Sequence, residues 1–514
     1  MVEQDKDKRI SELEAKVASL ESALVLKDQQ LAWFRKQMFG QRSEKHLPVD
    51  SNAIQLSLFE KPIDPEEQAR IDAAVARDEA NLEKTVVVAA HERKVRKPVD
   101  TSKLEVREEH IYPEGIKGHE SDYTEMEPEL TDSLEIVPAQ VYIRRIVRHK
   151  FVLKSSLQVC SPDRKVFEIA PLPAAPVHKC MAGASVLADI VMQKFLYHLP
   201  FYRVVQKYKE SGVEISDSTM NDWFAATCGK LKPLYDLLRR KVLQSEYIQV
   251  DESTLPVIDN EKHRAVKGYL WCVRDVLTGL VFFVYYNGSR SKETAKKLLS
   301  SYSGAIQTDG YSVYDEFESL PGKTMLGCWA HARRKFVEAL EENKRLASEA
   351  LVYIGDLYRI ESEMKDAGLD AEQKKERRQK ESYDIIRKFE DWMLAKYDQT
   401  AGGSLIRKAI EYTYKILPKL ARYVNDGRYN IDNNLVENAI RPLALGRKNY
   451  MFCGNDDAAC RAAIAYSLIS SCKAAGVEPR DWMEDVLRKL PEYETGKGDP
   501  SPLLPNVWQP TSKL

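Results

Sequence analysis

The most constraining feature of the sequence is a series of short apolar segments between residues 247 and 327, two of which carry an acidic residue. Short runs of β-branched and aromatic residues bounded by turn residues predict strands. Asp251 lies in the middle of the first segment, and Asp309 lies at the end of the fourth strand. In order, the sequence predicts strands at 247–257, 269–274 and 280–286, a polar helix at about 291–300, and strands at 305–310 and 323–327. Strands and helices in this succession indicate an α/β fold.

Three antiparallel strands, a helix and then a fourth strand make up the order of the ribonuclease-H-like fold. In that fold the first and fourth strands are neighbours, so Asp251 and Asp309 are expected to share one metal site. Carboxylate oxygens are preferred ligands of Mg²⁺, and two such ions about 3.5–4 Å apart stabilise the attacking and leaving oxygens of a phosphodiester. We therefore predict a multidomain α/β protein with a ribonuclease-H-like catalytic core at 241–475.

A third acid is expected from a later helix packed against the sheet, and the residues leave two candidates. The run 430–434 is a helix-start signal, and Glu437 lies about one turn into that helix. Glu437 can instead form a surface ion pair with Arg441, four residues later. Asp432 can instead cap the helix N-terminus. The pattern alone does not choose between them.

The chain has 514 residues, which exceeds one ordinary domain. Residues 7–39 carry apolar residues at spacings of three and four, which predict a self-associating coiled coil or an amphipathic helix packed on its own domain. A basic run at 93–98 is either solvated or bound to phosphate. The predicted order is a coiled-coil dimerisation helix at 1–45, a polar and basic linker at 46–107 with an acidic helical stretch, a small β-rich unit at 108–176 with a strand at 140–148, a helical unit at 177–240, the core at 241–475 and a C-terminal tail at 476–514.

The helical unit has the outline of a helix-turn-helix. Helices are expected at about 184–197 and 200–211, the second ending at Gly212, and Ser216–Ser218 offers an N-cap for a third. In DNA-binding proteins this outline places a recognition helix in the major groove, but many helical bundles share it. The unit is therefore either a DNA-binding unit or an ordinary bundle.

Overall charge does not decide whether nucleic acid is a partner, because 77 Lys and Arg balance 78 Asp and Glu. Eight cysteines are scattered without a CxxC pair, which is typical of reduced thiols. The first residues are charged, and no segment approaches the roughly 20 apolar residues of a membrane span. We expect a cytoplasmic protein without a signal peptide.

Five motifs resemble those of the transposases of the insertion-sequence-66 family, which are DDE-type enzymes of bacterial mobile elements. The resemblance covers nearly the whole chain, and the motifs follow the family's order. They are Phe34–Lys45, Lys194–Arg203, Cys328–Phe336, Ile431–Pro442 and Gly446–Tyr450.

This resemblance implies that Asp251, Asp309 and Glu437 form the catalytic and metal-binding triad, and it selects Glu437 as the third acid. It implies Mg²⁺ as the cofactor, with Mn²⁺ as a substitute. It further implies a helical insertion in the core at about 343–425, with helices at about 345–368, 372–397 and 403–417.

The implied function is binding of double-stranded DNA at transposon ends, followed by metal-dependent cleavage and strand transfer into target DNA. A dimer is expected because two ends must be joined, accessory proteins of the same element can take part, and the place of action is the bacterial nucleoid. Two other functions suit the same fold. One is a catalytically idle DNA-binding regulator that has lost an acid, although all three acids are present here. The other is a metal-dependent nuclease that only hydrolyses DNA.

Several basic residues within or beside the family motifs are candidates for contact with DNA phosphates. They are Arg333, Arg334, Lys335, Arg447 and Lys448. The first three can instead pair with the glutamates at 338, 341 and 342, and the last two can belong to a core-edge loop. His331 can touch the scissile phosphate or make a structural hydrogen bond.

The β-rich unit departs from the family pattern. Family members commonly carry a zinc-binding unit with two CxxC pairs before the core. Here the corresponding stretches, 112–115 and 153–156, contain no cysteine, and Cys160 alone cannot replace four ligands. We therefore expect a degenerate zinc-finger-like β unit without zinc.

Overall fold

The computed structural model describes residues 65–86, 141–147, 150–152, 167–169, 174–178, 180–259, 261–494 and 498–510. The chain divides into two compact units, Ala76–Arg144 and the remainder. The larger unit holds the elements described below, except residues 76–86 of a helix that begins at Pro65. Several predicted features lie outside the described residues: the coiled coil at 1–45, the basic run at 93–98, the stretches 112–115 and 153–156, and Cys160.

Two short strands of the β-rich unit are described, β1 (Lys150–Val152) and β2 (Phe167–Ile169), and they pair antiparallel. The strand expected at 140–148 is wrong over 141–147, where the backbone adopts no regular structure. Tyr142 and Ile143 remain 81% and 77% exposed. Residues with high strand propensity form a strand only where a partner strand and a packing surface are available.

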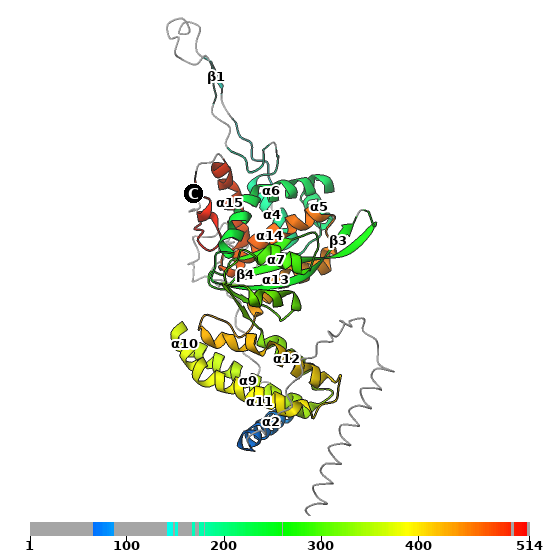
Figure 1. The fold of residues 1–514 in the computed structure, drawn as a ribbon. Coiled ribbons are helices and arrows are strands. Elements are labelled where there is room, and N and C mark those ends of the chain that lie inside the picture. Colours follow the sequence, from blue (N-terminus) through cyan, green and yellow to red (C-terminus); the bar gives the residue numbers. More distant parts are fainter. Residues whose placement is uncertain are drawn as a thin grey trace, which may run out of the picture. The chain divides into compact units, whose positions relative to one another are not determined.

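A five-stranded sheet forms the centre of the larger unit (Figure 1). Its order is β5-β4-β3-β6-β7, with β3–β4 and β4–β5 antiparallel and β3–β6 and β6–β7 parallel. The predicted adjacency of the first and fourth strands is confirmed, because Gln249 of β3 lies opposite Gln307 of β6. The strands are β3 (Tyr247–Asp259), β4 (Arg264–Asp275), β5 (Val281–Tyr285), β6 (Gly304–Gln307) and β7 (Lys323–Leu326).

Helices that precede the sheet in the sequence and helices that follow it pack with the sheet in one hydrophobic core. Figure 1 shows α4, α6, α14 and α15 gathered beside the sheet. The edge strand β5 is covered by α14, where Ser471 Oγ accepts from Val281 N at 2.9 Å and Ser467 Oγ from Phe283 N at 2.7 Å. These bonds provide hydrogen-bond partners for backbone N–H groups that have none in an uncovered edge strand. The helices are α4 (Ala184–Phe195), α5 (Phe201–Glu210), α6 (Asp217–Val242), α7 (Lys292–Leu299), α13 (Asn434–Tyr450), α14 (Asp456–Ala474) and α15 (Pro479–Glu494).

The helical unit at 177–240 begins as predicted but does not stand apart from the core. Ser216 caps α6, its Oγ accepting from Thr219 N at 3.1 Å. Further along α6, Leu231, Leu234 and Leu238 are completely buried in the core that contains the sheet. Most of α6 is therefore a core helix: one face is buried in this core, and the opposite face, which includes Lys232 and Arg240, is exposed.

A second hydrophobic core is built by the helices between β7 and α13. It contains Trp329, Phe389 and Trp392. Helices are present where the sequence predicts them at about 345–368, 372–397 and 403–417, and a π-helical turn divides the second of them. Ile71 of α2 (Pro65–Val86), the acidic helical stretch expected in the linker, is buried in the same core. The helices are α8 (Trp329–Ala339), α9 (Lys344–Asp366), α10 (Ala371–Arg377), a π-helical turn (Arg378–Ser382), α11 (Tyr383–Tyr397) and α12 (Leu405–Ala421).

Short 3₁₀ helices complete the described elements at Ser312–Ser319, Arg422–Asn425 and Ser501–Leu503. None of the described helices is long and apolar enough to cross a membrane. In the same part of the chain seven cysteines are free thiols, and five of them are buried.

Candidate active site

Three acidic residues are brought toward one end of the parallel strand pair. Asp251 lies within β3, opposite Cys272 of β4. Asp309 follows β6 by two residues, and because β3 and β6 run parallel, both acids lie beyond the paired residues Gln249 and Gln307. Glu437 lies in the first turn of α13.

The electrostatics of Asp251 indicate that these acids are close. Burial raises the pKa of the Asp251 carboxyl well above its ordinary value, and the negative charges of Glu252, Asp309 and Glu437 raise it further. Its Oδ1 accepts one hydrogen bond, from Glu252 N at 2.8 Å. The Asp251 carboxylate is thus partly desolvated among like charges, an arrangement that favours binding of a cation.

Asp309 is held in a tight loop by the helical insertion. Its Oδ1 accepts from Tyr311 N at 2.9 Å, and its carbonyl oxygen accepts from the Tyr412 hydroxyl at 2.6 Å. Gly310 adopts a φ of +81°, and a Cβ at this position would meet Tyr412 Oη at 2.9 Å. Only glycine suits both the backbone angle and this close approach.

Glu437 faces the N-terminal part of α8. Its Oε1 lies 3.6 Å from His331 Nε2, and its Oε2 lies 4.0 Å from an Arg334 nitrogen. Oε1 is buried and has no hydrogen-bond partner among the described residues. The alternative surface pair with Arg441 is not found among the ion pairs of the described part of the chain.

His331 lies next to Glu437, and its side chain is largely buried. Burial lowers the pKa of its imidazole, and the charges of Asp309 and Glu437 act in the opposite direction. Its Nδ1 is buried without a hydrogen-bond partner in the described structure. A neutral imidazole keeps one donor and one acceptor nitrogen, so His331 can donate to an oxygen without adding positive charge.

Glu252 is a buried acid that sequence reasoning missed. Its side chain is inaccessible, pairs with Arg290 at 2.5 Å and accepts from the Tyr314 hydroxyl at 2.8 Å. Burial raises its pKa, with Asp309 acting in the same direction and Arg290 against it. The only signal in the sequence was a second acid directly after Asp251 in an apolar strand. Because Glu252 already has two partners, it is less available to a metal than Asp251.

Asp432, the other candidate for the third acid, is engaged at the start of α13. Its Oδ1 accepts from Asn434 N at 3.1 Å, and its Oδ2 accepts from the Tyr358 hydroxyl at 3.0 Å. The N-cap of α13 is Asn433, which makes no side-chain cap bond, so the N-cap role expected of Asp432 is wrong, and its carboxylate instead bonds the first helical residue and Tyr358.

The donor chemistry of the three acids fits a hard divalent cation. Carboxylate oxygens are preferred ligands of Mg²⁺ and Mn²⁺, and a cation would relieve both the crowded charge at Asp251 and the unpartnered Oε1 of Glu437. Within the described residues, no group of three His, Cys, Asp or Glu side chains is close enough to hold a metal. Coordination by all three acids would therefore require their side chains to close around the ion.

The predicted basic residues divide into two groups. Arg447 and Lys448 lie in α13, so the core-edge loop expected there is wrong. The Arg447 guanidinium is turned inward and donates to Thr254 O at 2.6 Å and Ser253 Oγ at 3.1 Å, which connects α13 to β3. Lys335 pairs with Glu338 at 3.2 Å, which is the salt-bridge alternative. The exposed cations are Arg333, Arg334 and Lys448, of which Arg334 lies near Glu437.

Comparison with known proteins agrees with the motifs. Residues 179–461 match the model of the family described as "Transposase IS66 family", and residues 467–498 match "IS66 C-terminal element". Residues 28–108 match "Transposase C of IS166 homeodomain". Together these matches extend from the N-terminal region to α15.

Three similar proteins come from Sinorhizobium fredii, and all are uncharacterized. Protein y4jD is 30% identical over 393 residues, which cover 74% of this chain and 75% of y4jD. Protein y4qI is 30% identical, covering 70% of this chain and 68% of y4qI, and y4hP is 28% identical, covering 75% and 71%. With a family model that spans more than half of its residues, this chain belongs to the IS66 family of transposases.

Proposed function

We propose that the protein is a DDE transposase that cuts the ends of its element and joins them to target DNA, using Asp251, Asp309 and Glu437. The observation that carries this proposal is the placement of the three acids, with Asp251 on β3, Asp309 just after the neighbouring parallel strand β6, and Glu437 in the first turn of α13. Their proximity agrees with the raised pKa of Asp251. Support also comes from the sheet order β5-β4-β3-β6-β7, with acids on or just after the parallel pair, which is the order of a ribonuclease-H-like core.

Each acid has a distinct part in this proposal. Asp251 and Asp309 would hold the metal ions between them from adjacent strands, and Glu437 would complete the shell from α13. A divalent cation, when bound there, would stabilise negative charge on the attacking and leaving oxygens of the phosphodiester. His331, neutral beside Glu437, would donate a hydrogen bond to an oxygen of the scissile phosphate.

The reaction has two chemically similar steps. Attack of water on the phosphorus at the element's end forms a new P–O bond and breaks the P–O3′ bond, which frees a 3′-hydroxyl and leaves a 5′-phosphate. That hydroxyl then attacks a target phosphodiester, forming one bond while another breaks. Two ends must be joined in one complex, so we propose that the protein acts as a dimer, with accessory proteins of the element as further partners.

An exposed face of α13 provides a path for DNA that begins at Glu437. Arg441 and Lys448 are exposed on it and form no ion pair among the described residues. Leu445 is 53% exposed, and Phe452, just beyond the helix, is 44% exposed. Cations bind phosphates, and exposed apolar and aromatic side chains contact sugars and unstacked bases. We propose that the strand to be cut lies along this face.

The test is cleavage and strand transfer on DNA that carries the element's own ends, with Mg²⁺ or Mn²⁺. The single variants Asp251→Asn, Asp309→Asn and Glu437→Gln should each lose both steps by at least about a thousandfold while still binding the ends, because each removes charge stabilisation at the reacting phosphate. Lys335→Ala, which alters an exposed salt bridge, is the control and should retain activity.

Other outcomes of this assay would support other functions. Cleavage without joined product from pre-cut ends would indicate a nuclease of the same fold. End binding without either step, also in the presence of the element's accessory proteins, would indicate a regulator. Normal cutting by Glu437→Gln would contradict its assignment as the third acid.

A further inference from the structure

Two glutamines occupy matching positions on the strands that lead to the first two acids. Gln249 lies two residues before Asp251, and Gln307 lies two residues before Asp309. They are opposite each other in the parallel pair β3–β6, and both side chains are completely inaccessible to solvent. A buried amide is unfavourable unless its donors and its acceptor have hydrogen-bond partners. The burial of both side chains is therefore explained only if each amide is hydrogen-bonded.

Every hydrogen-bonding atom of the two amides has a partner. Gln249 Nε2 donates to Gln307 Oε1 at 2.8 Å and to Asp432 O at 3.0 Å. Gln249 Oε1 accepts from Val436 N at 3.1 Å. Gln307 Nε2 donates to Asn430 O at 2.8 Å and to Gly327 O at 2.9 Å.

These bonds converge on the segment that leads into the helix of the third acid. Asn430, Asp432 and Val436 lie within the seven residues before Glu437. Val436 N is among the first N–H groups of α13, which the helix itself leaves without an i−4 carbonyl, and Gln249 supplies an acceptor from the neighbouring strand. One pair of side chains therefore connects the strand of Asp251, the strand of Asp309 and the helix of Glu437.

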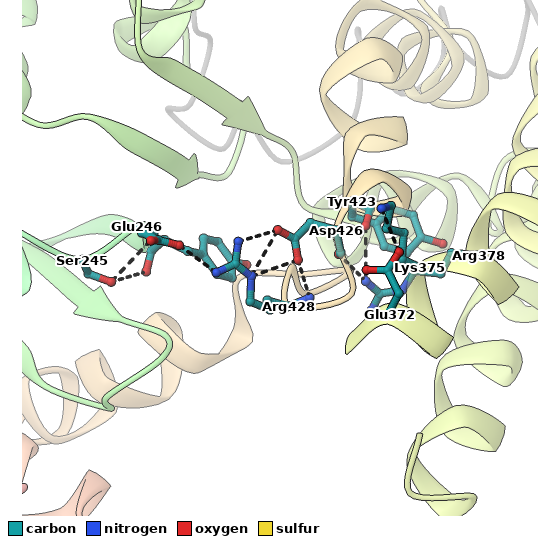
Figure 2. A network of polar contacts seen from close by, with 9 residues as sticks. Ser245, Glu246, Glu372, Lys375, Arg378, Tyr423, Asp426 and Arg428 are labelled. Carbon is teal, nitrogen blue, oxygen red and sulfur yellow. Dashed lines mark hydrogen bonds and ion pairs between the residues drawn. The ribbon is translucent and has the colours of Figure 1, made fainter. Parts of the chain in front are cut away.

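The start of the same segment is fixed by a second polar network. Figure 2 shows Arg428 between Glu246, just before β3, and Asp426, just after the 3₁₀ helix Arg422–Asn425. The Arg428 nitrogens lie 2.7 Å from each carboxylate. Arg378, buried in the insertion, donates to Asp426 O at 2.9 Å. The segment 426–436 is thus hydrogen-bonded at both ends, so the glutamines act on a chain with little freedom of its own.

We infer that Gln249 and Gln307 are positioning residues, which set where Glu437 stands relative to Asp251 and Asp309. An apolar side chain of the same length would fill the space but remove these bonds: Val436 N would keep only its bond to Asn433 O at 3.1 Å, and Asp432 O and Asn430 O would lose their glutamine donors. The loss of buried hydrogen bonds favours local rearrangement. That the two glutamines affect metal binding rests on the proposed function. That they hold the start of α13 in place through hydrogen bonds is independent of it.

The first test measures Mn²⁺ affinity by electron paramagnetic resonance and calorimetry, with no DNA present. Gln249→Met should bind Mn²⁺ about 10- to 100-fold more weakly than wild type, the range seen when a residue that orients a metal ligand is lost. If Gln249 acts through Glu437, Glu437→Gln should weaken binding much less in the Gln249→Met background than in the wild type.

The matched control is Ser471→Ala, which likewise removes a buried polar group bonded to backbone, in this case a hydroxyl bonded to Val281 N and O at 2.9 Å each. This site is at the far edge strand β5, so the variant should lose stability but keep the wild-type Mn²⁺ affinity. Equal loss of affinity in both variants would overturn the inference, because it would show a general effect of destabilisation.

The second test follows amide hydrogen exchange in the metal-free protein. Residues 434–438 should exchange at least about tenfold faster in Gln249→Met than in Ser471→Ala or wild type. If wild type binds no Mn²⁺ but this change occurs, the proposed function fails and the positioning role stands. If wild type binds Mn²⁺, and Gln249→Met shows the same affinity and the same exchange, the positioning role is wrong and the metal site stands.

Discussion

At the scale of single residues, Asp251 has the most unfavourable surroundings of the three acids. Its carboxyl is buried beside Glu252 and within the field of Asp309 and Glu437, and it accepts one backbone hydrogen bond. Such crowding destabilises the metal-free fold in its ionised form. Strongly perturbed carboxyls of this kind are concentrated at functional sites, because the same arrangement that destabilises the apo protein binds a cation.

The stability of the metal-free protein should therefore depend on pH through Asp251. The folded pKa is raised above the ordinary value of 3.8, so the stability this group contributes is fully present below that value and is lost as pH rises through the folded pKa. Asp251→Asn cannot ionise and should melt at a higher temperature than wild type at neutral pH in EDTA. The difference should vanish at acidic pH. Equal melting at neutral pH would contradict the crowded-charge description.

Two neighbouring cations on α13 should respond differently to substitution. Arg447→Ala should lower the free energy of unfolding by about 1–3 kcal/mol, because Thr254 O loses a buried charged donor. Lys448→Ala should leave stability unchanged, weaken binding to any duplex and reduce the slope of log affinity against log salt by about one. Chemical denaturation and a salt series of DNA binding would measure both. The reverse pattern would show that Arg447 is the DNA contact.

At the scale of elements, the C-terminal helix α15 belongs to the core of the sheet. Trp482 is completely buried, and its Nε1 donates to Leu503 O at 2.9 Å. Asp189 of α4 accepts hydrogen bonds from Tyr208 and pairs with Arg480 of α15, which draws the two helices together. Part of the region expected to be a C-terminal tail, 476–514, is thus a helix packed in the core.

Trp482→Ala should consequently lower the free energy of unfolding by about 3–5 kcal/mol, the usual range for emptying a buried aromatic site. Denaturant unfolding would measure this loss. Val507→Ala is a suitable control from the same region, because Val507 is 52% exposed and its truncation should change stability by less than about 0.5 kcal/mol. A small effect of Trp482→Ala would mean that α15 detaches before the core unfolds.

Local signals in the sequence predicted the elements well. Apolar runs bounded by turns located all five strands of the sheet, and the Ser216 cap located the start of α6. Non-local contacts were harder to predict. The burial of Leu231 and Leu234 in the core depends on which helix packs against the sheet, and the partners of Glu252 and Gln249 are distant in sequence. Hydropathy pattern carries no information about such pairings.

At the scale of the larger unit, two hydrophobic cores meet where the acids lie. One core contains the sheet, and the other contains the helical insertion and Ile71 of α2. The insertion reaches the candidate site directly, because Tyr412 of α12 donates to the carbonyl of Asp309 and Tyr358 of α9 donates to Asp432. The helices between β7 and α13 therefore hydrogen-bond both to Asp309 and to the start of α13.

The central claim is that Asp251, Asp309 and Glu437 surround one metal site, and iron-directed cleavage of the protein tests it most directly. Fe²⁺ replaces Mg²⁺ at oxygen-ligand sites, and with ascorbate and peroxide it produces hydroxyl radicals that cut the nearby backbone. Mass spectrometry should find cuts near residues 251, 309 and 437, suppressed by excess Mg²⁺ and lost in Asp309→Asn. Cuts at other segments, or near one acid only, would contradict the shared site.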